Sequence, residues 1–138
     1  MSPEGLTRLA SPYPVGITLD RVASAARERG MTVFARIDHA TGAVAAGLQM
    51  LPAEVLIFGT AVGGTPLMRA APTIAIDLPL KALAWQDESG ATWLAFNDPA
   101  WLARRHRLPA ALHADVEVVS AGLIAVARAA VAVDGSAV

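Results

Sequence analysis

The sequence predicts an α+β fold: a single domain with a mainly antiparallel sheet and helices packed on one of its faces. Its 138 residues are enough for one hydrophobic core and leave no room for a second domain of ordinary size. Stretches rich in β-branched residues alternate with stretches at helical spacing. The polar turn DESG at 87–90 separates two apolar runs and predicts a hairpin, which is antiparallel by necessity. A regular parallel βαβ series therefore does not fit, and the class is α+β.

The first half of the chain is predicted to contain three strands and two helices. Thr18 is suited to cap the first helix, Asp20 to lie in its positively polarised first turn, and Gly30 to end it. Asp38 follows a β-rich run, so we expect it to cap a short helix. In chain order, the predicted elements are a weak strand at 6–9, a helix from Thr18 to Gly30, a strand at 31–37, a short helix from about His39 and a strand at 53–59.

The second half is predicted to add the hairpin, another strand and three helices. Thr65 is suited to cap a short helix. Pro79 is expected to interrupt the strand at 73–78, because proline donates no ladder hydrogen bond. Asp98 followed by Pro99 is a typical helix start. In chain order, the predicted elements are a helix at 65–71, a strand at 73–78, hairpin strands at 80–86 and 91–96, a helix from Asp98 to Pro109, a helix at about 115–133 and a frayed tail at 134–138.

The composition predicts that the protein forms a homodimer. Hydrophobic residues make up 54% of the chain and charged residues 17%, where about a quarter charged is typical. Because so few charges leave little polar material to cover the surface, we expect an apolar patch buried against a second subunit. The C-terminal helix or a sheet edge is expected to contribute to that contact.

Charge and residue usage exclude several classes of partner. Eleven basic and twelve acidic residues give a formal net charge of −1, which offers no basic surplus for nucleic acid. The chain has no cysteine, its three histidines lack ligand spacing, and no cofactor motif is complete, so neither a metal nor a cofactor is expected. Residues 1–16 lack the apolar run of a signal peptide, and 121–133 is too short to span a bilayer. We therefore expect a cytoplasmic protein with no membrane partner.

His39 is the first candidate for a site. It is predicted to lie in the first turn of its helix, beside the small residues Gly42, Ala43 and Ala46. That arrangement leaves room for a small ligand, and a helix N-terminus favours an anion. A neutral imidazole at such a place could also act as a general base. The alternative is a histidine hydrogen-bonded in or near the core.

Two further stretches hold candidate site residues. FGTAVGGTPLM at 58–68 could form a backbone cradle for an anion, although a plain glycine turn with Thr65 capping a helix is the favoured explanation. Asp77 lies at the break made by Pro79, where it could face a cleft together with Lys81, the only lysine of the chain. His106, in the charged sequence ARRHR, is expected to be solvated.

The order of these signals resembles a known family. A histidine heading an alanine-rich helix, then EVLIFG, GTPLM, AIDLPLKALAW and FNDPAWLARRH, resembles the domain of unknown function family 302 of bacteria and archaea. The resemblance covers about Tyr13 to Leu108 and implies a compact α+β domain that tends to dimerise; it implies no reaction. The positions that match the family's signature residues are His39, Gly59, Thr65, Pro66, Asp77, Pro79, Lys81, Asn97 and Pro99.

The leading functional hypothesis is a cytoplasmic homodimer that binds a small polar or anionic ligand near His39. The proposed ligand-binding residues are the polar ones among the matched positions, namely His39, Asp77, Lys81, Asn97 and Thr65. Two alternatives remain open. One is an enzyme that uses His39 as a general base on a small polar substrate, and the other is a purely structural or interaction module.

Overall fold

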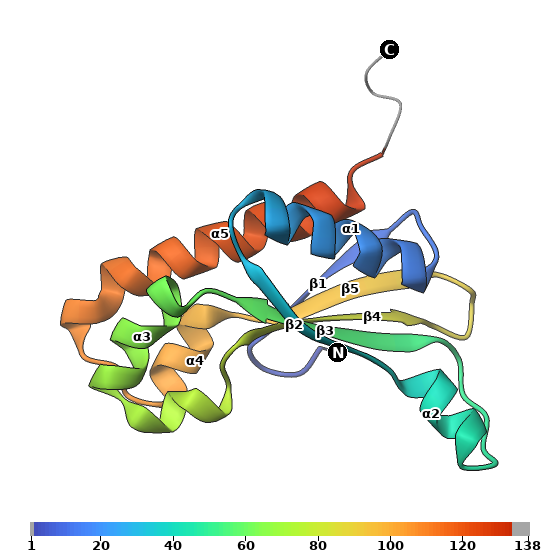
Figure 1. The fold of residues 1–138 in the computed structure, drawn as a ribbon, viewed down its shortest axis with the longest axis horizontal. Helices are drawn as coiled ribbons and strands as arrows, with labels where there is room; N and C mark the ends of the chain where they lie inside the picture. Colours follow the sequence, from blue (N-terminus) through green and yellow to red (C-terminus); the bar gives the residue numbers. More distant parts are fainter. Residues whose placement is uncertain (1, 134–138) are drawn as a thin grey trace.

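A five-stranded, fully antiparallel sheet forms the centre of the molecule (Figure 1). The computed structural model describes residues 2–133, so the predicted frayed tail at 134–138 lies outside the described residues. The strands are ordered β1-β5-β4-β3-β2, which makes β1 and β2 the edges. Their bounds are β1 Leu6–Ser11, β2 Thr32–Asp38, β3 Ala53–Gly59, β4 Leu80–Gln86 and β5 Thr92–Asn97.

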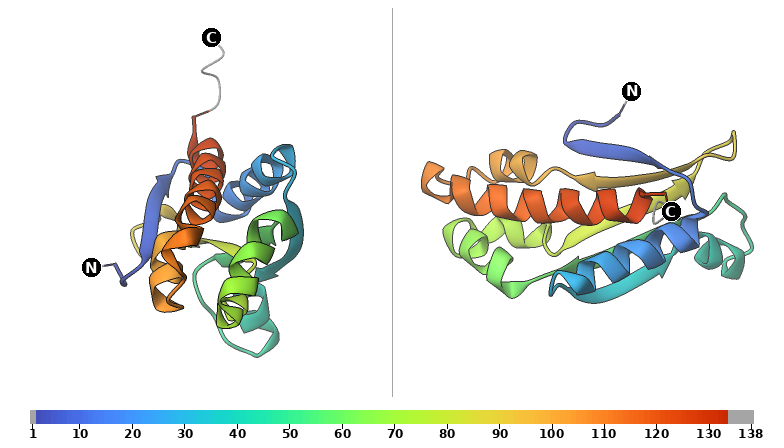
Figure 2. Two further views of the ribbon diagram at one scale, coloured as in Figure 1. Left: turned by 90° about the vertical axis from the view of Figure 1, so that its left-hand side faces the viewer. Right: turned by 90° about the horizontal axis from the view of Figure 1, so that it is seen from above.

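The helices cover one face of the sheet and its two ends (Figures 1 and 2). The two long helices, α1 and α5, lie side by side on one face, α3 and α4 gather at one end, and α2 extends from the opposite end. The helix bounds are α1 Val15–Glu28, α2 His39–Ala45, α3 Ala61–Ala70, α4 Pro99–Arg105 and α5 His113–Val131, with short 3-10 helices at η1 Pro72–Ile76 and η2 Ala110–Leu112. The predicted fold class, an antiparallel sheet with helices on one face, is confirmed.

The core lies between the sheet and the two long helices. Strand residues alternate between the two faces of a sheet, so Leu56 and Phe58 of β3 point toward the helices and are almost fully buried. Leu19 of α1 and Leu123 of α5 meet them there. A smaller cluster at the end of the sheet joins α3, η1, α4 and α5 through Leu67, Ile74, Leu102 and Val116.

The first helix begins earlier than the sequence predicted. Pro14 is at its N-cap, and Thr18 lies inside α1, fully buried. The Thr18 hydroxyl is 2.7 Å from the Ser11 hydroxyl and donates to the Pro14 carbonyl at 2.9 Å. Capping by Thr18 and first-turn placement of Asp20 were therefore wrong, because a threonine can satisfy its hydroxyl inside a helix on a carbonyl of the preceding turn.

The helix predicted at 65–71 is longer than expected and has a different cap. It begins at Ala61, and Thr60 is its N-cap, accepting a 3.0 Å hydrogen bond from the Gly63 amide. Thr65 lies in the second turn and caps nothing. Two adjacent glycines suggested a turn, but here they are helical, since glycine weakens a helix without forbidding it.

The strand predicted at 73–78 was also wrong. Pro72–Ile76 forms a 3-10 helix, and the Leu78–Pro79 peptide bond after it is cis. The alternating apolar pattern would place Ile74 and Ile76 on the same side of a strand. In the structure Ile74 is 1% exposed and Ile76 is 75% exposed, so the segment buries only one of them.

The last helix passes a length and composition test for a membrane span. The run Ala110–Val131 is long and apolar enough for this among the described residues. Its inner residues Leu123, Val126 and Ala130, however, belong to the main core together with α1 and the sheet. This helix therefore completes the core of the domain.

Candidate functional site

The structure separates His39 from the other proposed site residues. His39 begins α2 next to the Asp38–Glu54 end of the β2–β3 pair, whereas Asp77 precedes β4 at the other end, where Phe58 is opposite Leu80. Thr65 on α3 and Asn97 at the end of β5 lie at the Asp77 end as well. A single site that combines His39 with Asp77 and Lys81 is therefore not formed within one chain.

His39 is an exposed residue at the start of an exposed helix. No residue of α2 is buried, and Asp38 caps the helix by accepting a 3.0 Å hydrogen bond from the Thr41 amide, as predicted. That hydrogen bond lowers the pKa of the Asp38 carboxyl. His39 is thus no core histidine, and it is not among the residues that line the main cavity described below.

Asp77 instead forms a polar cluster with residues of α4. Its carboxylate accepts two hydrogen bonds from Arg105 Nη1, at 2.8 and 3.0 Å, and lies 2.5 Å from His106 Nε2. The other ring nitrogen of His106 is 2.8 Å from the Thr73 hydroxyl. Partial burial raises the pKa of Asp77, but the contacts with His106 and Arg105 outweigh it and leave the pKa below its usual value.

His106 was predicted to be solvated, and this was wrong. Its side chain is only 7% exposed, because Asp77 and Thr73 hold the ring between η1 and the end of α4. The sequence ARRHR suggested a charged helix end, and Arg104, Arg105 and Arg107 are indeed exposed. The histidine among them points inward, which local charge could not indicate.

Lys81 and Asn97 have little part in this cluster. Lys81 Nζ donates hydrogen bonds to the main-chain oxygens of Pro79, at 3.3 Å, and of Asp77, at 3.5 Å. Lys81 therefore contacts the backbone of Asp77, and the Asp77 carboxylate is bound by Arg105 and His106. Asn97 is exposed at the end of β5, opposite Leu6 of β1. Among residues 2–133, no group of three His, Asp or Glu side chains could hold a metal ion.

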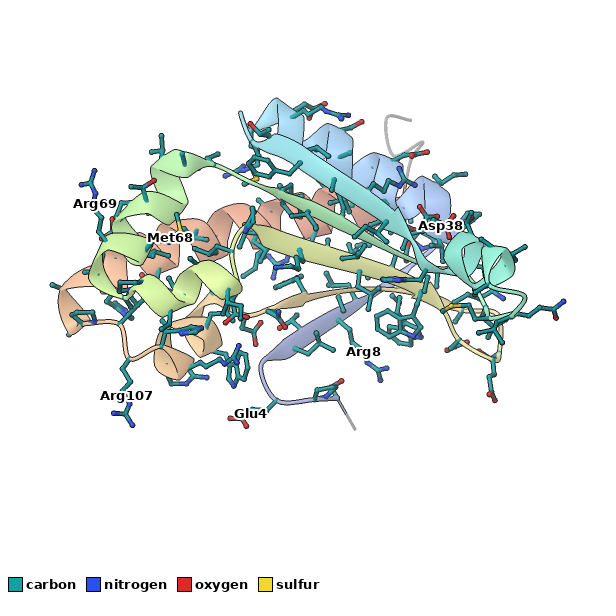
Figure 3. The ribbon with its side chains drawn as sticks, turned by 60° about the horizontal axis from the view of Figure 1, so that its bottom comes forward. Glu4, Arg8, Asp38, Met68, Arg69 and Arg107 are labelled. Carbon is teal, nitrogen blue, oxygen red and sulfur yellow. The ribbon has the colours of Figure 1, made fainter. Side chains whose placement is uncertain are left out.

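A cavity of about 440 Å³ lies beside the loop that follows β3. Its walls come from β2 and the residues before it, from α3, from the segment before β4 and from the middle of α5. Most of the lining is apolar or glycine, and Met68 of α3 faces inward while the neighbouring Arg69 extends outward (Figure 3). The lining residues are Arg29, Met31, Phe34, Gly59, Thr60, Ala61, Val62, Gly63, Gly64, Leu67, Met68, Leu78, Pro79, Leu80, Val118, Val119 and Gly122.

Two helical glycines, Gly64 of α3 and Gly122 of α5, belong to the lining of this cavity. An added Cβ at Gly64 would lie 3.6 Å from side-chain carbons of Leu78 and Met68, and one at Gly122 would lie 3.4 Å from Met31. Side chains larger than alanine at these positions would therefore crowd the lining of the cavity. The sequence drew attention to 58–68 as a cradle for an anion, but the contributions of Met31, Phe34 and α5 could not be seen without the fold.

Comparisons with known proteins place the chain among uncharacterised domains. The family model described as "Domain of unknown function DUF302" matches residues 7–127. A crystal structure described as an uncharacterized conserved protein DUF302 from Bacillus stearothermophilus has a TM-score of 0.82 and 16% sequence identity, and the similarity covers 93% of this chain and 99% of that one. At this identity the likeness concerns the fold.

Two curated relatives share a much closer sequence. Fluoride-specific ion channel FluC 1 from Brucella suis biovar 1 (strain 1330) is 50% identical over 114 residues, covering 83% of this chain and 44% of that protein. Fluoride-specific ion channel FluC 2 from Brucella melitensis biotype 1 (strain ATCC 23456 / CCUG 17765 / NCTC 10094 / 16M) is also 50% identical over 114 residues, covering 42% of that protein. The chain thus spans less than half the length of these relatives.

Proposed function

The chain belongs to the DUF302 family, and from this premise we propose that it is a cytoplasmic, homodimeric domain that binds a small ligand. One observation carries the ligand proposal, the cavity of about 440 Å³ between β2, α3 and α5. Ligand sites in proteins are typically hollows of about 300–1,000 Å³ with mainly apolar walls and a few polar groups. The cavity fits this description, and His39 is not among the residues that line it.

The walls of the cavity support binding over simple imperfect packing. Met31 and Met68 have unbranched, flexible side chains, which can adapt their conformation to the shape of a bound ligand. The hollow is open to solvent, and its lining includes three exposed apolar side chains, Phe34, Val62 and Val118. Apolar surface exposed in a concave site is typical of a ligand site. The hollow is therefore better explained by an occupant than by packing.

The homodimer is supported by the distribution of apolar surface. Among residues 2–133, eleven large hydrophobic side chains are exposed, and six of them fall between Phe34 and Leu51, on β2, α2 and the loop after it. β2 is also a sheet edge, with six of its seven residues exposed. Edge strands offer unpaired backbone groups to a second chain. We propose this part of the surface as the contact between subunits.

The curated relatives favour a second role, as an accessory domain of a fluoride channel. Their shared name is that of a fluoride-specific ion channel, and this chain matches less than half of each. In this proposal the domain binds the ligand of the cavity and is an accessory part of the channel protein. Fluoride itself suits the cavity poorly, because a strongly hydrated anion needs several donors and the walls are apolar. The protein should therefore have the same melting temperature in sodium fluoride as in sodium chloride.

A thermal-shift screen of metabolites tests the ligand proposal, because a ligand that binds the folded state raises the melting temperature by mass action. Gly64→Leu adds a side chain to the wall of the cavity, and Ala70→Leu is its control at an exposed position of the same helix outside the lining. Wild type and the control should respond to the same compound, and Gly64→Leu should not. An equal response of all three proteins would show that the compound binds outside the cavity.

Fractionation of cells that express the protein tests the cytoplasmic location.

A further inference from the structure

We infer that the ligand of the cavity is an amphiphile with an apolar chain and a single negatively charged head group. The inference rests on the proposed function and names the class of ligand for the same cavity. Three features of the molecule carry it: the apolar depth of the cavity, an arginine at its border, and the start of helix α3 in its wall.

The depth of the cavity suits a hydrocarbon chain. Leu67, Leu80 and Val119 form its inner wall, and Leu67 and Leu80 are themselves buried. The Thr60 hydroxyl, a polar group of the lining, accepts the hydrogen bond of the Gly63 amide and keeps its own O–H as a donor. Polar groups are few in this lining, so a ligand rich in hydroxyl or amide groups would replace few of its hydrogen bonds to water, whereas an alkyl chain would lose none.

The charge at the border selects an anion. Arg29 is the only charged residue among those that line the cavity, and it is exposed. The structure gives its guanidinium no ion pair with any described residue. The acidic residues that pair with arginines elsewhere, Asp20 and Glu54 with Arg36 and Asp77 with Arg105, belong to other contacts. A bound carboxylate could therefore take Arg29 as its partner without displacing another acid.

The start of α3 adds to this preference. Thr60, Ala61 and Val62 line the same cavity, and they are the N-cap and first two residues of a ten-residue helix. The first amides of a helix have no partner within it, and the helix dipole makes this end positive. A cationic head group would meet both Arg29 and this end with unfavourable charge. A neutral one would gain nothing from either.

Three compounds with the same ten-carbon chain test the class of ligand: decanoate, 1-decanol and decyltrimethylammonium, each below its micelle concentration and measured by calorimetry. Wild type should bind decanoate about tenfold more tightly than decyltrimethylammonium. Arg29→Gln should remove most of that advantage and leave the binding of 1-decanol unchanged. Arg104→Gln, an exposed arginine on α4 outside the lining, is the control and should behave as wild type.

Gly64→Leu separates this inference from the proposed function. It should abolish binding of all three compounds, and full retention of binding would show that the site lies elsewhere. Equal affinity of wild type for the three head groups, or preference for the cation, would overturn the anionic amphiphile and leave the cavity as a ligand site. Failure of all three to bind would also overturn the amphiphile. The proposed function falls only if the metabolite screen finds no cavity ligand either.

Discussion

Asp77 connects parts of the chain that are far apart in sequence. Its carboxylate follows η1, and both of its charged partners, Arg105 and His106, lie at the end of α4. The second ring nitrogen of His106 is within hydrogen-bond distance of the Thr73 hydroxyl. Because the His106 side chain is only 7% exposed, its loss would leave Asp77 partly buried with one partner fewer.

Replacement of the two histidines should differ clearly in its effect on stability. His106→Ala should lower the free energy of unfolding by about 2 kcal/mol, since it removes a buried hydrogen-bonded ring. His39→Ala should change it by less than about 1 kcal/mol, because that residue is exposed on a helix without buried residues. Urea denaturation followed by circular dichroism measures both. Similar losses in the two variants would contradict the roles assigned here.

Asp87 should make stability depend on pH in the acid range. Its carboxylate accepts hydrogen bonds from Ser89 and from the indole of Trp93, and these lower its pKa to about 2. Since the folded pKa lies below the unfolded value of about 4, the contribution is fully present above pH 4 and is lost as pH falls toward 2.

Unfolding by urea at several pH values tests this contribution of Asp87. Wild type should lose more stability than Asp87→Asn between about pH 4 and pH 2. Glu88→Gln is the control, because that neighbouring carboxylate has no hydrogen bond among those described. Parallel pH profiles of wild type and Asp87→Asn would contradict the prediction.

At the scale of elements, Gly5 fixes how the N-terminal segment meets α4. It has a φ of +77°, and an added Cβ would lie 2.3 Å from the ring of Trp101. Its carbonyl also accepts a 2.7 Å hydrogen bond from the amide of Asp98, the N-cap of α4. The glycine thus allows β1 to enter the sheet directly beside the tryptophan.

Gly5→Ala should therefore cost more than a backbone conformation alone explains. Gly47 is the matched control, since it has a φ of +79° and open space around it. Gly47→Ala should lower the unfolding free energy by about 1 kcal/mol through backbone strain, and Gly5→Ala by about 2 kcal/mol or more because the ring must move. The difference between their denaturation midpoints measures the contact with Trp101, and equal midpoints would argue against it.

Elements with strong local signals could be predicted from the sequence. The hairpin around 87–90, the strand 53–59 and the helix start at Asp98 have turn or capping residues whose preference agrees with the fold. The strand predicted at 73–78 failed because tertiary packing buries Ile74 alone. The cap of α3 failed because Thr60 and Thr65 have equal intrinsic preference as caps, and the glycines between them suggested a turn where the structure has helix.

The candidate site was less predictable than the fold. Local sequence placed Asp38 and His39 at a helix start, which is correct, but it could not show that this helix lies at the opposite end of the sheet from Asp77. The lining of the cavity combines Phe34 of the edge strand β2 with Val119 of α5, which lies more than eighty positions later in the chain. Such a combination depends on the strand order, which no local pattern contains.

At the scale of the whole molecule, the two edges of the sheet differ. β1 is followed by Pro12 and Pro14, and its Arg8 lies over the ring of Trp93 at 4.4 Å. Prolines and charges are means by which proteins protect a sheet edge. β2 leads into 39–53, fifteen residues without Asp, Glu, Lys or Arg, in which Val44 and Leu48 are largely exposed. β2 itself carries the charged residues Arg36 and Asp38 but no proline. Among the described residues, most of the large apolar side chains that are exposed lie on or next to this edge.

The proposed dimer should accordingly depend on β2. Wild type should have the mass of a dimer by light scattering at micromolar concentration. Ile37→Lys places a charge on the exposed side of this edge and should raise the dissociation constant by about tenfold or more, because a buried unpaired charge opposes association. Ile76→Lys is the control: Ile76 is more exposed than Ile37 and lies on η1, at the other end of the sheet, so it should leave the mass unchanged. A monomer mass for the wild type would contradict the proposed dimer. A dimer that forms equally well with Ile37→Lys would show that the contact lies on another surface.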